Sequence, residues 1–344
     1  MIKNFLKKNS SPKLIAEISA NHNGSISNAK KLIFMAKKNG ADAVKLQTYL
    51  ASTMVVKSRN KIYKIKKGLW RGKFLWDIYK KGETPFEWHK ELFNYAKKLK
   101  ILCFSTPFDE TAVDLLEDLN CPIYKIASFE INHIPLIKRI AQTKKPIIIS
   151  TGTADLKEID FAYEVANQSG AKNIILLYCV SNYPAKISDF NLNNINILKE
   201  RYKCRVGFSD HSKDSSIATT AVAMGAEFIE KHIALENQKT GLDIAFSLKG
   251  KQIRLFKDSL NKIHSLLGKN FFYRNVSEKN NKRFRRSIFS TQDIQKGEKF
   301  SKDNINCLRP FVGVSTLFYS KLIGKKSLKK IKSGTPIKIN MFRI

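Results

Sequence analysis

The chain has 344 residues, of which 43% are hydrophobic, and this length and composition suit a globular domain of barrel size with a small appendage. Its formal net charge is +33. No apolar run approaches the roughly 18 residues that a membrane helix needs, and the basic segment Met1–Lys13 lacks the apolar stretch of a secretory signal, so we expect a cytoplasmic protein without membrane contact. The five cysteines form no CxxC pair, which favours free thiols in a reducing compartment.

Eight short apolar segments recur along the first 233 residues, and helix-length stretches separate most of them. They are Leu14–Ser19, Ala43–Gln47, Ile101–Thr106, Ile123–Ser128, Ile147–Thr151, Ile174–Cys179, Val206–His211 and Phe228–His232. Eight β-then-α units is the number that closes a parallel barrel. The sequence therefore predicts an α/β protein in which residues 1–268 form a (β/α)8 TIM barrel.

Helix signals fit these units. The first helix is expected to begin at Ser27 as its N-cap and to stop at Asn39-Gly40. Further helices are predicted for the segments Glu110–Leu119, Pro135–Gln142, Ile217–Met224 and Lys251–Leu267. The last of these would close the barrel.

A long insertion, Thr48–Glu83, follows the second predicted strand. A loop of this length in a barrel is usually functional or disordered, and its aromatic content favours order. All three tryptophans of the chain lie within Trp70–Trp88. Two interpretations stay open: a lid or contact surface near the barrel mouth, or the simple packing of an extra helix.

The composition changes after the barrel. Residues 269–282 are polar and basic and are predicted to form a linker. Residues 283–344 contain three short β-like segments, Ser287–Thr291, Asn306–Arg309 and Pro336–Ile339. We expect a small β-rich C-terminal domain that is too small to be very stable alone.

Two histidines, His211 and His232, end neighbouring predicted strands. Neighbouring strand ends lie close together at the catalytic rim of a barrel, so both imidazoles could bind one divalent metal ion. Two imidazoles with water and substrate oxygens suit Mn²⁺. The alternative is a pair of unrelated structural histidines.

Charged side chains end other predicted strands at the same rim. Glu17 could act as a general acid/base there, cap the following turn or pair with a lysine. Lys45 and Lys125 end the second and fourth strands. Hydroxyl groups at corresponding depth belong to Thr106, Ser128, Ser150 and Ser209. Two lysines with these hydroxyls predict a phosphate-binding site.

Several ordered motifs together resemble those of the sialic acid (nonulosonic acid) synthase family. They are Ala16–Ser25, Lys45–Gln47, Ser105–Asp109, Tyr124–Ser128, Ser150–Gly152, Ser209–His211 and Glu230–His232. Arg285–Ser287 and Arg309-Pro310 resemble the antifreeze-like SAF domain of that family, which implies a SAF domain over residues 283–344. Within the family the tryptophan-rich insertion and Asp243–Leu248 are most similar to the pseudaminic acid synthases.

This resemblance implies a metal-dependent condensation of phosphoenolpyruvate with 2,4-diacetamido-2,4,6-trideoxy-altrose, giving pseudaminic acid and phosphate. It implies Mn²⁺, or else Mg²⁺ or Co²⁺, on His211 and His232, and acid/base catalysis by Glu17. Phosphoenolpyruvate contacts are implied for Lys45, Thr106, Lys125, Ser128, Ser150 and Ser209. Sugar contacts are implied for Gln47, Tyr183 and Asp243. Arg309 matches an arginine that one subunit of a homodimer inserts into the partner's barrel.

The chain departs from the family pattern at Phe311 and at Ser181-Asn182, which affects the expected sugar contacts. An N-acetylneuraminic or legionaminic acid synthase is the alternative within the family. A non-catalytic basic barrel that binds nucleic acid is the alternative from another class. The positive charge is mostly lysine (50 Lys and 12 Arg) and spread along the chain, which favours solvated helix faces over a nucleic-acid site. Such a surface could also attract an anionic substrate.

Overall fold

The computed structural model describes residues 1–8, 10–182, 185–268 and 271–343. The chain divides into two compact units, Met1–Gly268 and Lys269–Ile344. None of the described helices combines the length and the apolar character required to cross a membrane.

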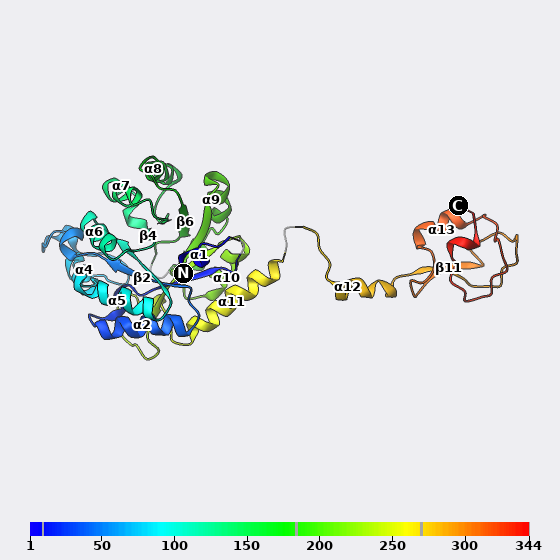
Figure 1. Ribbon diagram of the computed structural model, residues 1–344, viewed down its shortest axis with the longest axis horizontal. Coiled ribbons are helices and arrows are strands. Elements are labelled where there is room, and N and C mark those ends of the chain that lie inside the picture. The colour runs from blue at the N-terminus through cyan, green and yellow to red at the C-terminus, as the bar shows by residue number, and fades with distance from the viewer. Residues whose placement is uncertain (9, 183–184, 269–270, 344) are drawn as a thin grey trace. The chain divides into compact units, whose positions relative to one another are not determined.

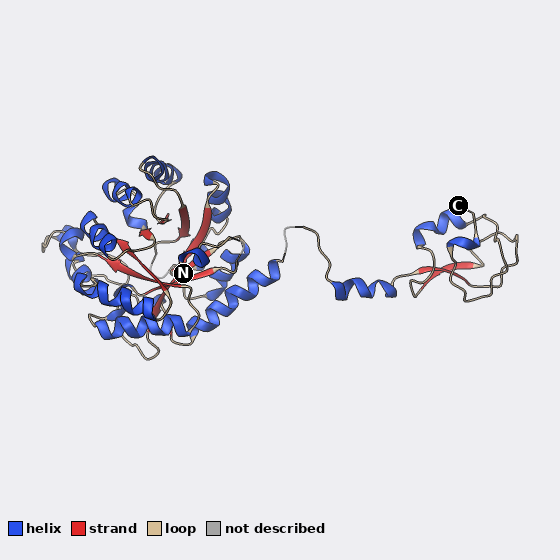
Figure 2. Cartoon of the chain, in the orientation of Figure 1, coloured by secondary structure: helices blue, strands red, loops and turns tan. Residues whose placement is uncertain are grey.

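The first unit is a closed barrel of parallel strands (Figure 2). The strands are β1 (Lys13–Glu17), β2 (Ala43–Thr48), β3 (Leu102–Pro107), β4 (Tyr124–Ile126), β5 (Ile147–Ser150), β6 (Ile174–Cys179), β7 (Arg205–Asp210) and β8 (Phe228–Ala234). Each strand pairs with the next along the chain, and β1 also pairs with β8, which closes the cylinder. A short strand, β9 (Leu248–Lys249), extends the pairing beyond β8. The predicted TIM barrel is confirmed.

Helices surround these strands (Figure 1). They are α2 (Ile26–Lys38), α5 (Phe86–Lys98), α6 (Glu110–Asp118), α7 (Ile134–Gln142), α8 (Leu156–Gln168), α9 (Asn194–Tyr202), α10 (Ser215–Ala223) and α11 (Gln252–Leu267). Short 3₁₀ turns follow several strands as η1 (Ser19–His22), η3 (Ser128–Glu130), η4 (Ile187–Asp189) and η5 (Ile244–Phe246).

Helix α2 shows how the sequence sets these elements. It buries Leu32 and Ile33, together with small residues one turn away, against the strands. The predicted N-cap, Ser27, is wrong: the Oγ atom of Ser25 accepts a hydrogen bond from the Asn28 N–H at 3.3 Å, so the helix begins two residues earlier. Both serines are plausible caps by residue type, and the extended backbone at Ser25 decides between them.

The N-terminal end of the barrel is filled by aromatic side chains. A short helix, α1 (Ile2–Phe5), buries Phe5 with its ring centroid 6.3 Å from that of Phe104 and 5.4 Å from that of Phe228. Offset and tilted ring pairs at such distances are favourable. This packing leaves the opposite, C-terminal end of the barrel as the open one.

The insertion that follows β2 is folded and has secondary structure of its own. It contains α3 (Ala51–Met54), η2 (Lys61–Tyr63) and α4 (Leu75–Gly82). Trp70 Nε1 donates a hydrogen bond to the Leu242 carbonyl at 3.3 Å, which ties the insertion to the loop after β8. Trp88 lies instead in the helix layer and packs against the barrel core. The insertion thus contacts the loop after β8, and its role as a lid or contact surface stays a prediction.

The second unit has an antiparallel pair, β10 (Ser287–Ser290) and β11 (Ile305–Leu308), over its own apolar core. Its helices are α12 (Val276–Asn280), η6 (Asn281–Phe284), η7 (Thr316–Phe318), α13 (Tyr319–Leu322) and η8 (Ile339–Met341). The predicted strand at Pro336–Ile339 is wrong: its contacts with β10 are a bridge between Phe289 and Pro336 and a hydrogen bond from Ile337 N–H to the Ile288 carbonyl. The pairing does not extend into a longer ladder, because η8 begins at Ile339.

Candidate active site

The carboxyl ends of the barrel strands surround a small polar chamber of about 70 Å³, which we call the inner chamber. Register places Glu17 of β1 between Lys45 of β2 and His232 of β8. The inner chamber is lined by Glu17, Lys45, Gln47, Thr106, Lys125, Ala127, Ser128, Ser150, Ser209, His211, Glu230 and His232. Barrel closure therefore brings together predicted residues that are widely separated in the sequence.

The predicted site residues not yet accounted for are Tyr183, Asp243 and Arg309. Tyr183 lies outside the described residues. Asp243 lines an adjoining apolar chamber and lies near the histidine pair. Arg309 belongs to the C-terminal unit, where it is exposed directly after β11.

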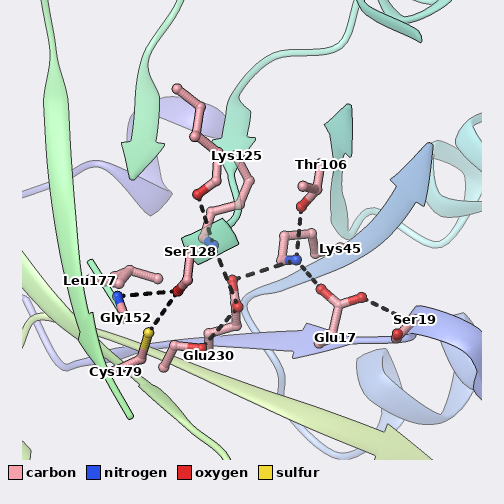
Figure 3. Close-up of polar contacts among 12 residues, drawn as sticks. Glu17, Ser19, Lys45, Thr106, Lys125, Ser128, Gly152, Leu177, Cys179 and Glu230 are labelled. Atoms are coloured by element: carbon pink, nitrogen blue, oxygen red, sulfur yellow. Dashed lines mark hydrogen bonds and ion pairs between the residues drawn. The ribbon is translucent and has the colours of Figure 1, made fainter. Parts of the chain in front are cut away.

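A chain of buried charges crosses the inner chamber (Figure 3). Lys45 Nζ forms an ion pair with Glu17 and lies 3.7 Å from Glu230 Oε2. The same ammonium donates a hydrogen bond to Thr106 Oγ1 at 3.0 Å. Lys125 Nζ lies 3.8 Å from Glu230 Oε1. Two ammonium groups thus alternate with two carboxyl groups in a space shielded from water.

Burial raises the pKa of Glu17 to about 7, although Lys45 opposes this shift and the Ser19 N–H donates to Glu17 Oε1 at 2.7 Å. Burial also disfavours the charged form of Lys45, but Glu17 and Glu230 outweigh it and hold the pKa of Lys45 above its ordinary value. Glu17 can therefore gain or lose a proton near neutral pH beside a lysine that stays charged.

Sequence analysis gave no role to Glu230, which contacts both lysines. Burial favours its neutral form, but Lys125 and Lys45 hold the pKa of Glu230 below its usual value. Burial conversely lowers the pKa of Lys125, against the attraction of Glu230. Glu230 lies two residues before His232 in β8, so strand alternation puts both side chains on one side of the sheet. That spacing was the signal available in the sequence.

The hydroxyl groups complete one wall of the inner chamber. Ser128 Oγ accepts a hydrogen bond from the Gly152 N–H at 3.2 Å and lies 3.0 Å from Cys179 Sγ. A Cβ atom at Gly152 would lie 2.1 Å from Ser181 Oγ and 2.8 Å from Ser128 Oγ. Glycine is therefore required there because the backbone approaches these side chains closely. Ser209 donates to Glu230 Oε1 at 3.1 Å.

The two predicted metal-binding histidines lie together, with ring centroids 5.5 Å apart. Burial lowers the pKa of His211 to about 4, and burial with the nearby His211 holds the pKa of His232 well below its usual value. Both rings are therefore neutral at neutral pH, which is the form that binds metals. Within the described ranges, no third histidine, cysteine or acid joins them in a group that could hold a metal ion.

One atom of this pair has unused hydrogen-bonding capacity. His232 Nδ1 is buried and has no hydrogen-bond partner in the part of the chain that the structure describes, while Asp243 Oδ2 lies 3.7 Å away. A buried ring nitrogen without a partner fits a ligand position. The residues present suit an ion that takes two protein nitrogens and leaves its other positions to oxygen ligands.

Two other strand-end residues do not belong to the inner chamber. Lys231 Nζ forms an ion pair with Asp210 Oδ2 at 2.8 Å and donates to the Ser212 carbonyl at 2.5 Å. Both charged groups are buried and satisfied by each other. This ion pair links the end of β7 to β8. His211 directly follows Asp210 and His232 directly follows Lys231, so the pair holds the backbone beside both histidines in place.

A second chamber of about 230 Å³, which we call the outer chamber, adjoins the first. Both chambers are lined by Gln47, Ser128 and His232, so they are adjacent. The outer chamber also contains Asp243 and Glu130, whose pKa values are both raised by burial, that of Glu130 to about 7. Its remaining walls are mostly apolar and aromatic.

The chain is similar in sequence to several named synthases. The chain is 41% identical over 327 residues to a pseudaminic acid synthase of Helicobacter pylori, covering 95% of this chain and 96% of that protein. It is 38% identical over 329 residues to an N,N'-diacetyllegionaminic acid synthase of Campylobacter jejuni, covering 94% and 98%.

Solved structures give the same result. The structure of an N-acetylneuraminic acid (sialic acid) synthetase from Leptospira borgpetersenii, in complex with citrate, matches with a TM-score of 0.72 and 32% identity. The match covers 79% of this chain and 90% of that chain. Residues 285–343 match the SAF domain, and residues 32–271 match the NeuB family. The chain therefore belongs to the NeuB family.

Proposed function

We propose that this chain is a pseudaminic acid synthase, which condenses phosphoenolpyruvate with 2,4-diacetamido-2,4,6-trideoxy-altrose to give pseudaminic acid and phosphate. The observation that carries the proposal is the inner chamber, where two buried lysines lie beside two neutral imidazoles and a carboxyl group with a pKa of about 7. The NeuB family match and the similarity to named pseudaminic acid synthases support the choice of reaction.

Phosphoenolpyruvate is an anion, and the inner chamber offers it two ammonium groups and several hydroxyl donors. Lys45 and Lys125 would bind its phosphate and carboxylate groups, with Thr106 and the seryl hydroxyls as hydrogen-bond donors. The anion would then share the lysines with Glu230. These fixed charges stabilise the phosphate as negative charge shifts onto it during the reaction.

His211 and His232 would hold a divalent ion, which we propose to be Mn²⁺, with Mg²⁺ and Co²⁺ as alternatives. Such an ion, when bound, supplies Lewis-acid polarisation of the sugar aldehyde oxygen. Gln47 and Asp243 border the same region and would orient the sugar hydroxyl and amide groups. Tyr183 stays a further predicted sugar contact.

The bond changes then follow from the chemistry of the two substrates. C3 of phosphoenolpyruvate attacks the aldehyde carbon, a new C–C bond forms, and positive charge develops at C2. Water adds at C2, phosphate leaves with cleavage of the C2–O bond, and the new C2 hydroxyl gives its proton to the departing phosphate as the keto group forms. Glu17 would donate a proton to the aldehyde oxygen and accept one from the attacking water, for which a pKa of about 7 is well placed.

The decisive assay mixes the protein with phosphoenolpyruvate, Mn²⁺ and one sugar at a time, and measures phosphate release and product mass. We expect release that depends on the 2,4-diacetamido sugar. Release that depends instead on N-acetylmannosamine or on the legionaminic acid precursor would assign the chain to a relative's reaction, as the 38% identity to a legionaminic acid synthase makes reasonable. Absence of sugar-dependent release, with tight nucleic-acid binding, would support the non-catalytic alternative.

The pKa of Glu17 predicts a pH dependence. Because Glu17 acts first as the proton donor to the aldehyde oxygen, kcat/KM should be level at low pH and fall as pH rises through an apparent pKa near 7, since higher pH removes the proton from this group. Glu17→Gln cannot titrate, so its residual activity should show no such limb. A limb of equal position in Glu17→Gln would assign the titration to another group.

We also propose that the protein is a homodimer in which Arg309 of one subunit completes the site of the other. We propose further that the protein is located in the cytoplasm. The exposure of Arg309 in a unit with its own core, and five free cysteines, support these two proposals. Co-expression of differently tagged Glu17→Gln and Arg309→Ala chains tests the dimer. If Arg309 acts on the partner, each heterodimer contains one site with an intact Glu17 and an intact Arg309, so activity should partly return.

If Arg309 acts within its own chain, every site in that heterodimer keeps one defect and activity stays absent. Purification through both tags ensures that heterodimers are measured. Each variant expressed alone provides the baseline, and the wild-type chain carrying both tags provides the maximum. Purified heterodimers without activity would contradict the proposed arrangement.

A further inference from the structure

The outer chamber is walled by the insertion between β2 and α5. Besides Tyr49, six side chains of the insertion line the chamber: Met54, Ile65, Trp70, Leu75, Ile78 and Tyr79. The Trp70 Nε1 hydrogen bond to the Leu242 carbonyl closes one side. The ring of Tyr49 packs edge-on against Tyr79, with centroids 6.0 Å apart, and closes another.

These insertion side chains do not serve the barrel core. None of them belongs to the main cluster of buried apolar residues or to the partly buried residues packed against it. They are nevertheless half-buried, whereas Ile62 and Val56 of the same insertion are 72% and 67% exposed. These half-buried side chains line the outer chamber.

The outer chamber adjoins the inner chamber, where the aldehyde would react. Gln47, Ser128 and His232 line both chambers. An open-chain sugar whose aldehyde lies at His232 therefore extends its distal carbons toward the insertion. One acceptor is available there for an amide N–H, because Glu130 Oε2 is buried and has no hydrogen-bond partner in the described ranges.

We infer that the apolar wall of the insertion is a specificity subsite that selects a sugar with methyl and acylamino groups on its distal carbons over one with hydroxyl groups. This inference rests on the proposed function and deepens it. A hydroxyl placed against Ile65 or Ile78 would lose water without gaining a partner, which is unfavourable. A methyl or acetyl group would bury apolar surface at the same place.

Two acceptors with the same stereochemistry test the inference. One is 2,4-diacetamido-2,4,6-trideoxy-altrose, and the other is 2-acetamido-2-deoxy-altrose, which carries hydroxyls at C4 and C6. The measured quantity is the ratio of their kcat/KM values. We expect the wild-type ratio to favour the first sugar by at least about tenfold, in line with what apolar pockets achieve per group.

Ile65→Thr and Ile78→Thr each place a hydroxyl in the wall of the outer chamber. Both should lower the ratio by about tenfold, mainly by lowering kcat/KM for the diacetamido sugar. Ile62→Thr is the matched control, because it is the same change in the same insertion at an exposed side chain. Thermal unfolding of all three variants shows whether each is folded, and the ratio for the folded protein is independent of how much is active.

A ratio in both chamber variants that stays within about twofold of the Ile62→Thr ratio would overturn the inference while leaving the proposed function intact. Failure of the proposed function would give a different experimental result. In that case the wild-type protein itself releases no phosphate with either altrose acceptor, and the inference falls with it.

Discussion

Replacing His232 with alanine is expected to lower sugar-dependent phosphate release by about a hundred- to a thousandfold, the loss typical when a group that stabilises a developing oxyanion is removed. His211→Ala should have the same effect, because the two neutral rings lie 5.5 Å apart and would hold one ion together. Titration with Mn²⁺, followed calorimetrically, should show weakened or absent binding in both variants. Activity and metal binding should therefore fall together.

The fold should survive these changes. His232 Nδ1 has no hydrogen-bond partner among the described residues, so its removal breaks no bond of that nitrogen within the chain. His264→Ala, on helix α11 and away from both chambers, is the matched control and should retain activity and metal binding. Full activity of His211→Ala and His232→Ala in the presence of a chelator would contradict the metal site. Lost thermal stability with unchanged metal binding would indicate a purely structural role.

Lys125→Met is expected to lower kcat/KM for phosphoenolpyruvate, because a charged contact in a buried site is lost. The loss of transition-state stabilisation should be about 2–4 kcal/mol. The KM for phosphoenolpyruvate should rise far more than the KM for the sugar. Lys45→Met should behave similarly but also lower stability, because it leaves Glu17 without its ion-pair partner. Initial rates with each substrate varied in turn measure both constants.

Lys231→Met is the control that separates an effect on phosphoenolpyruvate binding from an effect on protein stability. Lys231 is as buried as Lys125, but it pairs with Asp210 and does not line the inner chamber. Its removal should cost about 3–5 kcal/mol of unfolding free energy, the range for breaking a buried pair, without changing the ratio of the two KM values. If Lys45→Met and Lys125→Met also leave that ratio unchanged, the lysines do not bind phosphoenolpyruvate.

Local sequence was sufficient for the barrel and for most of the inner chamber. Alternating helix and strand patterns predict the units, and the closure of a parallel barrel brings the carboxyl ends of its strands to one rim. Glu17, Lys45 and His232 were therefore predictable as neighbours, because each stands near the end of its strand and the register of β1 with β2 and β8 aligns them.

The two incorrect predictions concern segments for which the local sequence is compatible with two different structures. Ser25 and Ser27 are both good N-caps, and the backbone direction after η1 selects Ser25. Pro336–Ile339 has the apolar pattern of a strand, but η8 begins at Ile339, and a single bridge to Phe289 results.

Tertiary structure alone decided the charges and the outer chamber. Whether Glu17 has a pKa near 4 or near 7 depends on burial and on the distance to Lys45, neither of which is a property of the local sequence. Glu230 acquires its role only because barrel closure sets it between lysines from β2 and β4. The apolar residues of the insertion could equally have entered the core. Their arrangement around a cavity follows from long-range contacts such as Trp70 with Leu242, and spacing along the chain does not encode such contacts.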